Sequence, residues 1–346
     1  MVQYFQYNNL AVILNVRRAK SPRLSGVHRK YRLQDLIMGF DASDLRFLLS
    51  ANRLGLQGNS VCTLGHQTLY LSQYELNRVL KEYGRECFSL PKGRLSLFAD
   101  DVLRPLGFTK IDSMDNSDFE GATVIHDLNR PVPSEMHEKY DLVWDGGTLE
   151  HVFNFPAALE SAMRMVKIGG HIALHTPANN QCGHGFYQFS PELFFRAFAH
   201  ENAFELLRIY LNCDGSHYHI ADPACVHDRV QLLNSKGAFI MVHARKVAHV
   251  PDVLKTPQQS DYLTIWTEHQ TEKRDGGIKS FIRARISPAS VAKISKVLNN
   301  LRHRRTVWRW KTQSNLSNRQ FYVPVTNWDV PTSQIFNRKK LPPAFS

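Results

Sequence analysis

The sequence predicts an α/β fold in which helices cover a mostly parallel sheet, because strand-like and helix-like segments alternate at its centre. Short apolar runs over 140–144 and 171–175 are typical of buried strands. Between them, apolar residues recur with a period near 3.6 over 157–166, which predicts a helix. A strand, a helix and a strand in so short a stretch form a βαβ unit with a right-handed crossover. The centre of the chain is therefore expected to hold parallel strands.

Two glycine pairs interrupt this unit. Gly146 and Gly147 follow the first strand directly after Asp145, and glycines there let the backbone approach a ligand closely. The helix is expected to begin after Pro156, because proline is tolerated in a first helical turn. It is expected to end at Gly169–Gly170, as a left-handed cap would end it.

The segments before this unit supply further elements of the predicted sheet. In order along the chain we expect a helix from Asp41, a strand over 60–65, a helix near 72–83, and strands over 108–111 and 122–125.

The segments after the unit complete the sheet. Ser190 is expected to cap a helix that begins at Pro191, and strands over 204–211 and 238–247 follow. The loop over 212–236 carries a group of potential metal ligands whose spacing matches no standard zinc pattern, so no metal site is predicted. These residues are His217, His219, Asp222, Cys225 and His227.

Composition narrows the class of protein. The chain has 346 residues, of which 43% are hydrophobic, as is ordinary for a soluble globular protein. No apolar run approaches the roughly twenty residues that span a bilayer. An N-terminal apolar patch is followed, not preceded, by basic residues, which argues against a secretory signal. Five scattered cysteines without a Cys-x-x-Cys pair fit reduced thiols, so a cytoplasmic protein is expected.

Charge divides the chain into three parts. Residues 271–346 hold 16 Lys or Arg and 3 Asp or Glu, and residues 1–40 hold 7 and 1. The rest is mildly acidic, with 20 basic and 27 acidic residues. We therefore expect a basic N-terminal arm over 1–40, a domain over 41–250, and a basic C-terminal extension over 251–346. The extension is expected to contain one amphipathic helix from Ser287 and an extended tail over 312–346.

The basic ends have two interpretations. Their charges most simply lie in water, with the apolar stripe of the helix packed on the domain. Alternatively, basic residues interleaved with Trp308 and Trp310 bind an anionic partner, such as nucleic acid or a membrane surface.

The central stretch resembles the second half of class I S-adenosylmethionine-dependent methyltransferases. Four groups of residues, in the family's order, carry the resemblance: Tyr140–Val143, Leu149–His151, Arg164–Gly170 and His175–Pro177. The resemblance implies a Rossmann-like sheet of seven mostly parallel strands with helices on both faces. It also implies the cofactor S-adenosylmethionine and transfer of a methyl group.

The family's glycine-rich loop is only partly matched. A class I enzyme has Gly-x-Gly-x-Gly after its first strand, because a side chain there would collide with the cofactor. This chain has Gly65, followed by Gln67 and Leu69 at the next two positions. Either Gln67 contacts the cofactor from a shifted loop, or the pocket is partly closed.

Acidic residues at strand ends are the other candidates for cofactor binding. Asp112 is the first choice for the ribose hydroxyls, which a carboxylate at the tip of the second strand can accept, with Asp115 the next choice. By resemblance, Asp127 meets the adenine amino group, and Asp145 and Gly146 line the same pocket. Asp112 and Asp127 are explained equally well as ordinary turn residues.

Candidates for the acceptor side lie near the fourth and fifth strands. His151 and His184 are candidate bases, because histidine has the right pKa to take a proton from a hydroxyl nucleophile. Glu150 could orient His151, contact the acceptor, or cap a helix. Tyr187 and Phe189 could wall an acceptor pocket, although core packing explains them as well.

Three functions remain open on the sequence. The leading one is S-adenosylmethionine-dependent methylation, on oxygen, of a small-molecule or carbohydrate-type acceptor. The first alternative is an inactive methyltransferase-like scaffold or regulatory protein, because two loop glycines are absent. The second is a nucleic-acid-binding or nucleic-acid-modifying protein, because both ends of the chain are basic.

Overall fold

The computed structural model describes residues 39–94, 96–262 and 314–336, together with the single positions 296, 300, 301, 304 and 307. All elements below belong to the unit that contains residues 38–346. The predicted arm up to residue 38 lies outside the described residues, as does most of the helix predicted from Ser287. No helix in the described part of the chain is long and apolar enough to cross a membrane.

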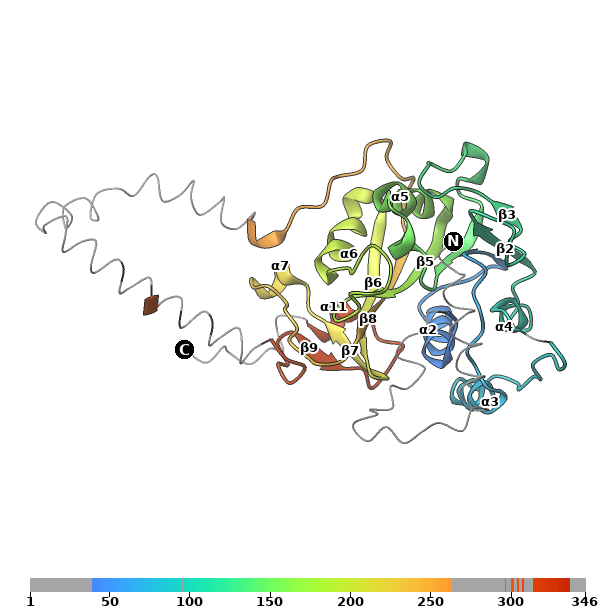
Figure 1. Cartoon of the computed structure of the whole chain (residues 1–346), viewed down its shortest axis with the longest axis horizontal. Coiled ribbons are helices and arrows are strands. Elements are labelled where there is room, and N and C mark those ends of the chain that lie inside the picture. Colours follow the sequence, from blue (N-terminus) through green and yellow to red (C-terminus); the bar gives the residue numbers. More distant parts are fainter. Residues whose placement is uncertain are drawn as a thin grey trace, which may run out of the picture. The chain divides into compact units, whose positions relative to one another are not determined.

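A single mixed sheet forms the centre of this unit (Figure 1). Its nine described strands are β1 (Ser60–Leu64), β2 (Lys110–Asp115), β3 (Val124–Ile125), β4 (Tyr140–Asp145), β5 (Val166–Pro177), β6 (Phe204–Cys213), β7 (Ser216–Ile220), β8 (Ala238–Lys246) and β9 (Tyr322–Pro324).

The strand order is β3-β2-β1-β4-β5-β8-β6-β7-β9. The first five strands in this order are parallel, and β8 runs antiparallel to both β5 and β6. The expected α/β class is confirmed, but the expected seven-stranded, mostly parallel sheet is wrong. β7 and β9 extend it with two more antiparallel pairings.

Helices cover both faces of the sheet. The described helices are α2 (Ala42–Arg53), α3 (Gln73–Glu82), α4 (Asp100–Leu103), α5 (Phe155–Met165), α6 (Pro191–Ala197), α7 (Pro223–Val226) and α11 (Thr332–Ile335), with short 3-10 helices η2 (Ser134–Met136), η3 (Leu149–His151) and η4 (His200–Asn202). Apolar side chains of α2, α3 and α4 share one cluster, and those of α5 and α6 share the other.

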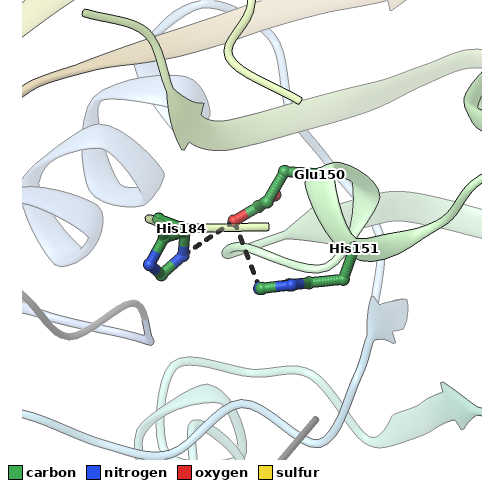
Figure 2. Close-up of side chains that lie close together, drawn as sticks. All are labelled: Glu150, His151 and His184. Atoms are coloured by element: carbon green, nitrogen blue, oxygen red, sulfur yellow. Dashed lines mark ion pairs between the residues drawn. The ribbon is translucent and has the colours of Figure 1, made fainter. Parts of the chain in front are cut away.

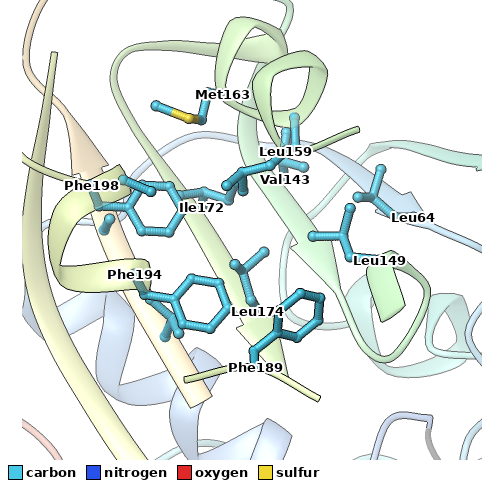
Figure 3. Close-up of a cluster of buried hydrophobic side chains, with 14 of the residues drawn as sticks. Leu64, Val143, Leu149, Leu159, Met163, Ile172, Leu174, Phe189, Phe194 and Phe198 are labelled. Carbon is cyan, nitrogen blue, oxygen red and sulfur yellow. The ribbon is translucent and has the colours of Figure 1, made fainter. Parts of the chain in front are cut away.

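Neighbouring residues of a central strand face opposite clusters, which explains why these strands are apolar throughout. Leu142 lies in the cluster with α2 and α3, whereas Val143 lies in the cluster with α5. Figure 3 shows Val143 and Ile172 from the sheet beside Leu159 and Met163 from α5.

α5, the helix between β4 and β5, ends earlier than the Gly169–Gly170 pair suggested. α5 stops at Met165, and β5 begins at the next residue, so Gly169–Gly170 lie within the strand. The pairing of β4 with β5 shifts register between Tyr140 and Leu142. The left-handed backbone of Gly169 therefore serves an irregularity in the strand, where glycine is as useful as it is in a helix cap.

The C-terminal residues 314–336 complete the sheet, so the expected extended tail is wrong for this part of the chain. β9 pairs with β7, and the Trp328 carbonyl accepts a hydrogen bond from Arg208 at 2.8 Å. Arg208 is fully buried on β6, and its guanidinium also donates to the Phe47 carbonyl, the Ser50 hydroxyl and His243 Nδ1. This residue therefore joins α2, the sheet and the C-terminal segment.

Candidate functional site

The strand order reverses between β1 and β4. From β1 the sheet continues outward to β2 and β3, and from β4 it continues outward to β5. Loops that leave the carboxyl ends of two such strands turn to opposite faces of the sheet, which leaves a crevice between them. Open α/β sheets bind their ligands at this point, so the ends of β1 and β4 are the first place to look for a site.

The loop after β1 begins with a left-handed glycine. Gly65 has a φ of 73°, and its N–H donates to the Met114 carbonyl at 2.7 Å. Two residues later the chain runs beside residues 97–99, and Leu69 is buried against α2 and α3. Leu69 thus belongs to the core and does not enter the crevice.

Gln67 closes the space between the ends of β1 and β4. A Cβ atom added to Gly146 would lie 2.5 Å from Gln67 Oε1, and one added to Gly65 would lie 3.2 Å from Gln67 Nε2. The amide donates to the Leu64 carbonyl and lies 3.5 Å from Thr148 Oγ1. Of the two predictions for this loop, the geometry matches a partly closed pocket.

The end of β4 carries a buried carboxyl group. Asp145 Oδ1 accepts hydrogen bonds from the Thr148 N–H at 2.8 Å and the Leu149 N–H at 3.4 Å, whereas Oδ2 has no hydrogen-bond partner in the part of the chain that the structure describes. Burial raises the pKa of Asp145 well above its usual range, and the nearby charge of Glu150 raises it further. The hydrogen bonds from the Thr148 and Leu149 N–H groups explain why an Asp ends this strand, since they begin the turn into η3.

Glu150, His151 and His184 converge beside this turn (Figure 2). Glu150 is fully buried, and its Oε1 lies 3.3 Å from His184 Nε2 and 3.9 Å from His151 Nε2. Among the described residues, neither Glu150 Oε1 nor His184 Nε2 has a hydrogen-bond partner. Burial lowers the pKa of His151, and the charge of Glu150 opposes this shift. The structure thus brings together three residues that the sequence singled out separately.

The loop that carries His184 is fastened to Glu150. The Glu150 carbonyl accepts hydrogen bonds from the N–H groups of Phe186 at 2.7 Å and Tyr187 at 3.3 Å. Gly185 has a φ of 71°, and a Cβ atom there would lie 2.8 Å from the same carbonyl. A glycine is therefore needed for this close approach.

The two aromatic residues predicted to wall an acceptor pocket have packing partners. Phe189 is buried, and its ring centroid lies 4.5 Å from that of Phe155. The Tyr187 hydroxyl donates a hydrogen bond to the Phe153 carbonyl. Core packing, the alternative interpretation, accounts for Phe189, and Tyr187 lies at the edge of the same cluster.

Asp112 is not at the tip of β2, so its prediction as a strand-end carboxylate is wrong. β2 extends three residues beyond it to Asp115. The Asp112 carboxylate accepts from the Tyr140 hydroxyl at 2.7 Å and lies 3.4 Å from Lys139 Nζ, near the start of β4. Asp115, the second choice, occupies the strand end.

Asp127 lies in a turn after β3. Its Oδ1 accepts from the N–H and the side-chain amide of Asn129, and these hydrogen bonds lower its pKa. Arg130 Nε lies 3.8 Å from Oδ2. The turn interpretation explains these contacts without a ligand.

Several buried polar atoms near the ends of β4 and β5 have no hydrogen-bond partner. Within the described residues these include Trp144 Nε1, Asp145 Oδ2, Glu150 Oε1, His175 Nε2 and His184 Nε2. Buried polar atoms in folded proteins are nearly always paired, so such a group indicates a place that a ligand, ion or water completes.

His175 and Asp44 form a buried pair that was not predicted. His175 Nδ1 lies 2.9 Å from Asp44 Oδ1, which joins the end of β5 to α2. Burial opposes the charge on His175, but Asp44, with Asp41 and Glu150, outweighs it and raises the pKa of His175 to about 9. The sequence shows a histidine near the end of a buried strand, but it gives no sign of the pairing because Asp44 lies far away along the chain.

Comparisons with known proteins find likeness among solved structures only. No family model and no curated protein sequence matches the chain. A branched-chain polyamine synthase from Thermus thermophilus, in complex with N4-aminopropylspermidine and 5'-methylthioadenosine, is 12% identical, with 63% of this chain and 59% of that chain covered and a TM-score of 0.31. The chain thus spans about three fifths of that protein.

Two methyltransferases are among the other similar structures. The 1,6-didemethyltoxoflavin-N1-methyltransferase of Burkholderia thailandensis, with S-adenosylhomocysteine bound, is 12% identical over 66% of this chain and 95% of that chain, with a TM-score of 0.32. The 16S rRNA N2 G1207 methyltransferase of T. thermophilus, in complex with AdoMet and guanosine, is 13% identical over 66% of this chain and 42% of that chain. Its TM-score is 0.29. At these values the activity must be argued from the chain's own residues.

Proposed function

We propose that this chain is an S-adenosylmethionine-dependent methyltransferase whose cofactor crevice lies at the carboxyl ends of β1 and β4. The observation that carries the proposal is the strand order, with its reversal between β1 and β4 and an antiparallel β8 between β5 and β6. A switch point of this kind is the ligand-binding place of open α/β sheets. The resemblance of the central stretch to class I methyltransferases supports the same location.

The residues at the switch point fit this cofactor only when Gln67 turns away. Its carboxamide now occupies the space over Gly65 and Gly146. This group is the far end of a flexible side chain, so rotation that loses the hydrogen bond to the Leu64 carbonyl costs about 1 kcal/mol. With Gln67 rotated, Asp115 at the end of β2 is our choice for the ribose hydroxyls. Asp127 keeps the adenine contact that the resemblance implies.

When bound, S-adenosylmethionine would supply an electrophilic methyl group for an acceptor oxygen. The chain's own part is to align the acceptor and exclude water. A hydroxyl acceptor would also lose a proton, and the position of His151 in η3, with His184 beside it, supports either histidine as the base that takes it. We therefore favour O-methylation of a small-molecule or carbohydrate-type acceptor.

A second candidate function is a methyltransferase-like scaffold without cofactor. The position of Gln67 favours it, because a closed crevice excludes the ligand unless the side chain moves.

Calorimetric titration of the full chain with S-adenosylmethionine tests the two candidates, with displacement by S-adenosylhomocysteine as a check on the site. Saturable binding to the natural chain supports the methyltransferase. Binding to Gln67→Ala alone supports the scaffold, because the natural crevice is then closed. Absence of binding heat and thermal shift with both proteins overturns the methyltransferase proposal.

A further inference from the structure

We propose that Glu150, His151 and His184 bind one divalent transition-metal ion, which in turn holds an oxygen atom of the acceptor. Metal binding at these residues does not depend on the proposed methyl transfer. Only the use of the ion to hold the acceptor rests on the proposed function.

The three side chains have nearly the spacing that one ion needs. One ligand atom from each residue lies within 4.8 Å of the other two. Ligands at about 2.0 Å from zinc in a tetrahedral site stand about 3.3 Å apart. The distance from Glu150 Oε1 to His184 Nε2 is already 3.3 Å, and the distance to His151 Nε2 is 3.9 Å. His151 is partly exposed, so its ring has room to rotate toward the other two ligand atoms, which lie within 4.8 Å of its own.

A bound cation accounts for a carboxylate that protein groups leave incomplete. Glu150 is fully buried, and a buried carboxylate is costly unless a cation and hydrogen bonds compensate for its charge. Its Oε1 faces two imidazole nitrogens, yet makes a hydrogen bond to neither. A proton shared with one imidazole would leave the other without a partner, whereas a divalent ion satisfies all three atoms.

The surroundings hold these ligands in place. Thr176 Oγ1 donates to Glu150 Oε2 at 3.3 Å, so the other carboxylate oxygen points toward the histidines. Both N–H groups that bind the Glu150 carbonyl belong to the loop that carries His184. Support of this kind around metal ligands is typical of functional sites, where it fixes their orientation.

The donor set indicates which metal and which further ligand would bind. Two imidazoles and one carboxylate suit Zn²⁺, Fe²⁺ or Co²⁺ better than Mg²⁺, which prefers oxygen ligands. Three protein ligands leave at least one position for an exchangeable ligand, as in catalytic zinc sites. A hydroxyl bound there loses its proton more easily, because the cation stabilises the alkoxide. The charge of the ion would then activate the acceptor hydroxyl, in place of a histidine base that accepts its proton.

Cobalt is a suitable probe, because its visible absorption reports coordination by the protein. The full chain is freed of metal with a chelator and titrated with Co²⁺ in the absence of cofactor, and Zn²⁺ is then added. We expect absorption that saturates at one Co²⁺ per chain and is removed by Zn²⁺. Glu150→Gln and His184→Gln are expected to weaken binding by at least about 10- to 100-fold, the loss that is typical when only a supporting partner of a metal ligand is removed. The control His200→Gln, at an exposed histidine of η4, leaves it unchanged.

Two results would overturn the metal site. One is absence of Co²⁺ absorption by the natural chain, a result that needs no variant and does not depend on variant folding. The other is uptake that is equal in His184→Gln, Glu150→Gln and the natural chain. If Co²⁺ binds but S-adenosylmethionine does not, the metal site stands and the methyltransferase proposal falls.

Discussion

Two charged side chains are fully buried in opposite halves of the sheet, and their surroundings differ. Arg208 lies in the antiparallel half, and all three guanidinium nitrogens donate hydrogen bonds to protein atoms. Glu150 lies in η3, after β4 in the parallel half, and one of its carboxylate oxygens accepts no hydrogen bond from any described residue. Arg208 thus ties the fold together, whereas Glu150 has a position open for a partner outside the chain.

The number of hydrogen-bonding atoms without a partner distinguishes a buried charged group that stabilises the fold from one that serves a function. A charged group whose hydrogen-bonding atoms are all satisfied stabilises the fold, and its removal leaves several partners unpaired. A charged group with an unsatisfied atom costs stability, which proteins accept at functional sites. Substitution of Arg208 and substitution of Glu150 should therefore change stability in opposite directions.

The largest expected effect is that of Arg208→Met, which removes a buried charged group whose three nitrogens all donate hydrogen bonds. It removes the donors to His243 Nδ1 and one of the two side-chain donors to each of the Phe47 and Trp328 carbonyls, so we expect the free energy of unfolding to fall by about 3 kcal/mol. Urea denaturation measures it. The control Arg245→Met, at a partly exposed pair with Glu205, should cost less than about 1 kcal/mol. Similar losses for both variants would refute the role of Arg208.

The next effect concerns the His175–Asp44 pair, which joins the end of β5 to α2. Because the pKa of His175 is raised from 6.5 to about 9 on folding, its protonation stabilises the fold fully below pH 6.5. This contribution is lost as the pH rises through 9, and amounts to at most about 3 kcal/mol.

Urea denaturation between pH 6.5 and pH 9 measures this loss. The other titratable groups that face His175 are Asp44, Asp41, Glu150 and His217, so the natural chain is compared with His175→Gln at each pH. The variant should lack most of the slope. A slope that is unchanged in the variant would assign the pH dependence to another group.

A smaller effect is expected for Gln67→Ala, which opens the proposed cofactor crevice. Removal of the carboxamide saves the roughly 1 kcal/mol needed to turn it away, so S-adenosylmethionine should bind about five- to tenfold more tightly. Calorimetric titration measures the change. Weaker binding by the variant would show that Gln67 contacts the cofactor, as the shifted-loop alternative requires.

The smallest effect has the opposite sign to that of Arg208→Met. In metal-free protein, Glu150→Gln replaces an incompletely paired buried carboxylate with a neutral amide that can still accept from Thr176. We expect the free energy of unfolding to rise by about 1 kcal/mol. Urea denaturation in the presence of chelator provides the measurement. A loss of stability instead would place Glu150 with Arg208 as a structural group.

Much of the sheet could be predicted because the central strands are apolar on both faces. β1, β4 and β5 appear as short apolar runs, and the Ser190–Pro191 pair begins α6 as expected. β7 was missed because its sequence is polar, and β9 because it is three residues long and ends in a proline. Their pairing depends on tertiary contacts that no local pattern records.

The candidate site could be predicted only in its parts. Glu150, His151 and His184 were each named, but their approach to one another depends on how the loop after β5 folds back onto η3. Asp112 was misplaced because the end of β2 differed by three residues from the expected one. Such a shift moves a side chain to the other face of a strand or away from its tip.

The pairing of β9 with β7 has a consequence for the order in which the strands of the sheet fold. β9 pairs with β7 although about a hundred residues of chain separate them, and contacts so distant along the chain form slowly. Until β9 arrives, β7 presents unpaired backbone groups that can recruit a strand from a second molecule. Recovery of native protein after dilution from denaturant should therefore decline as protein concentration increases.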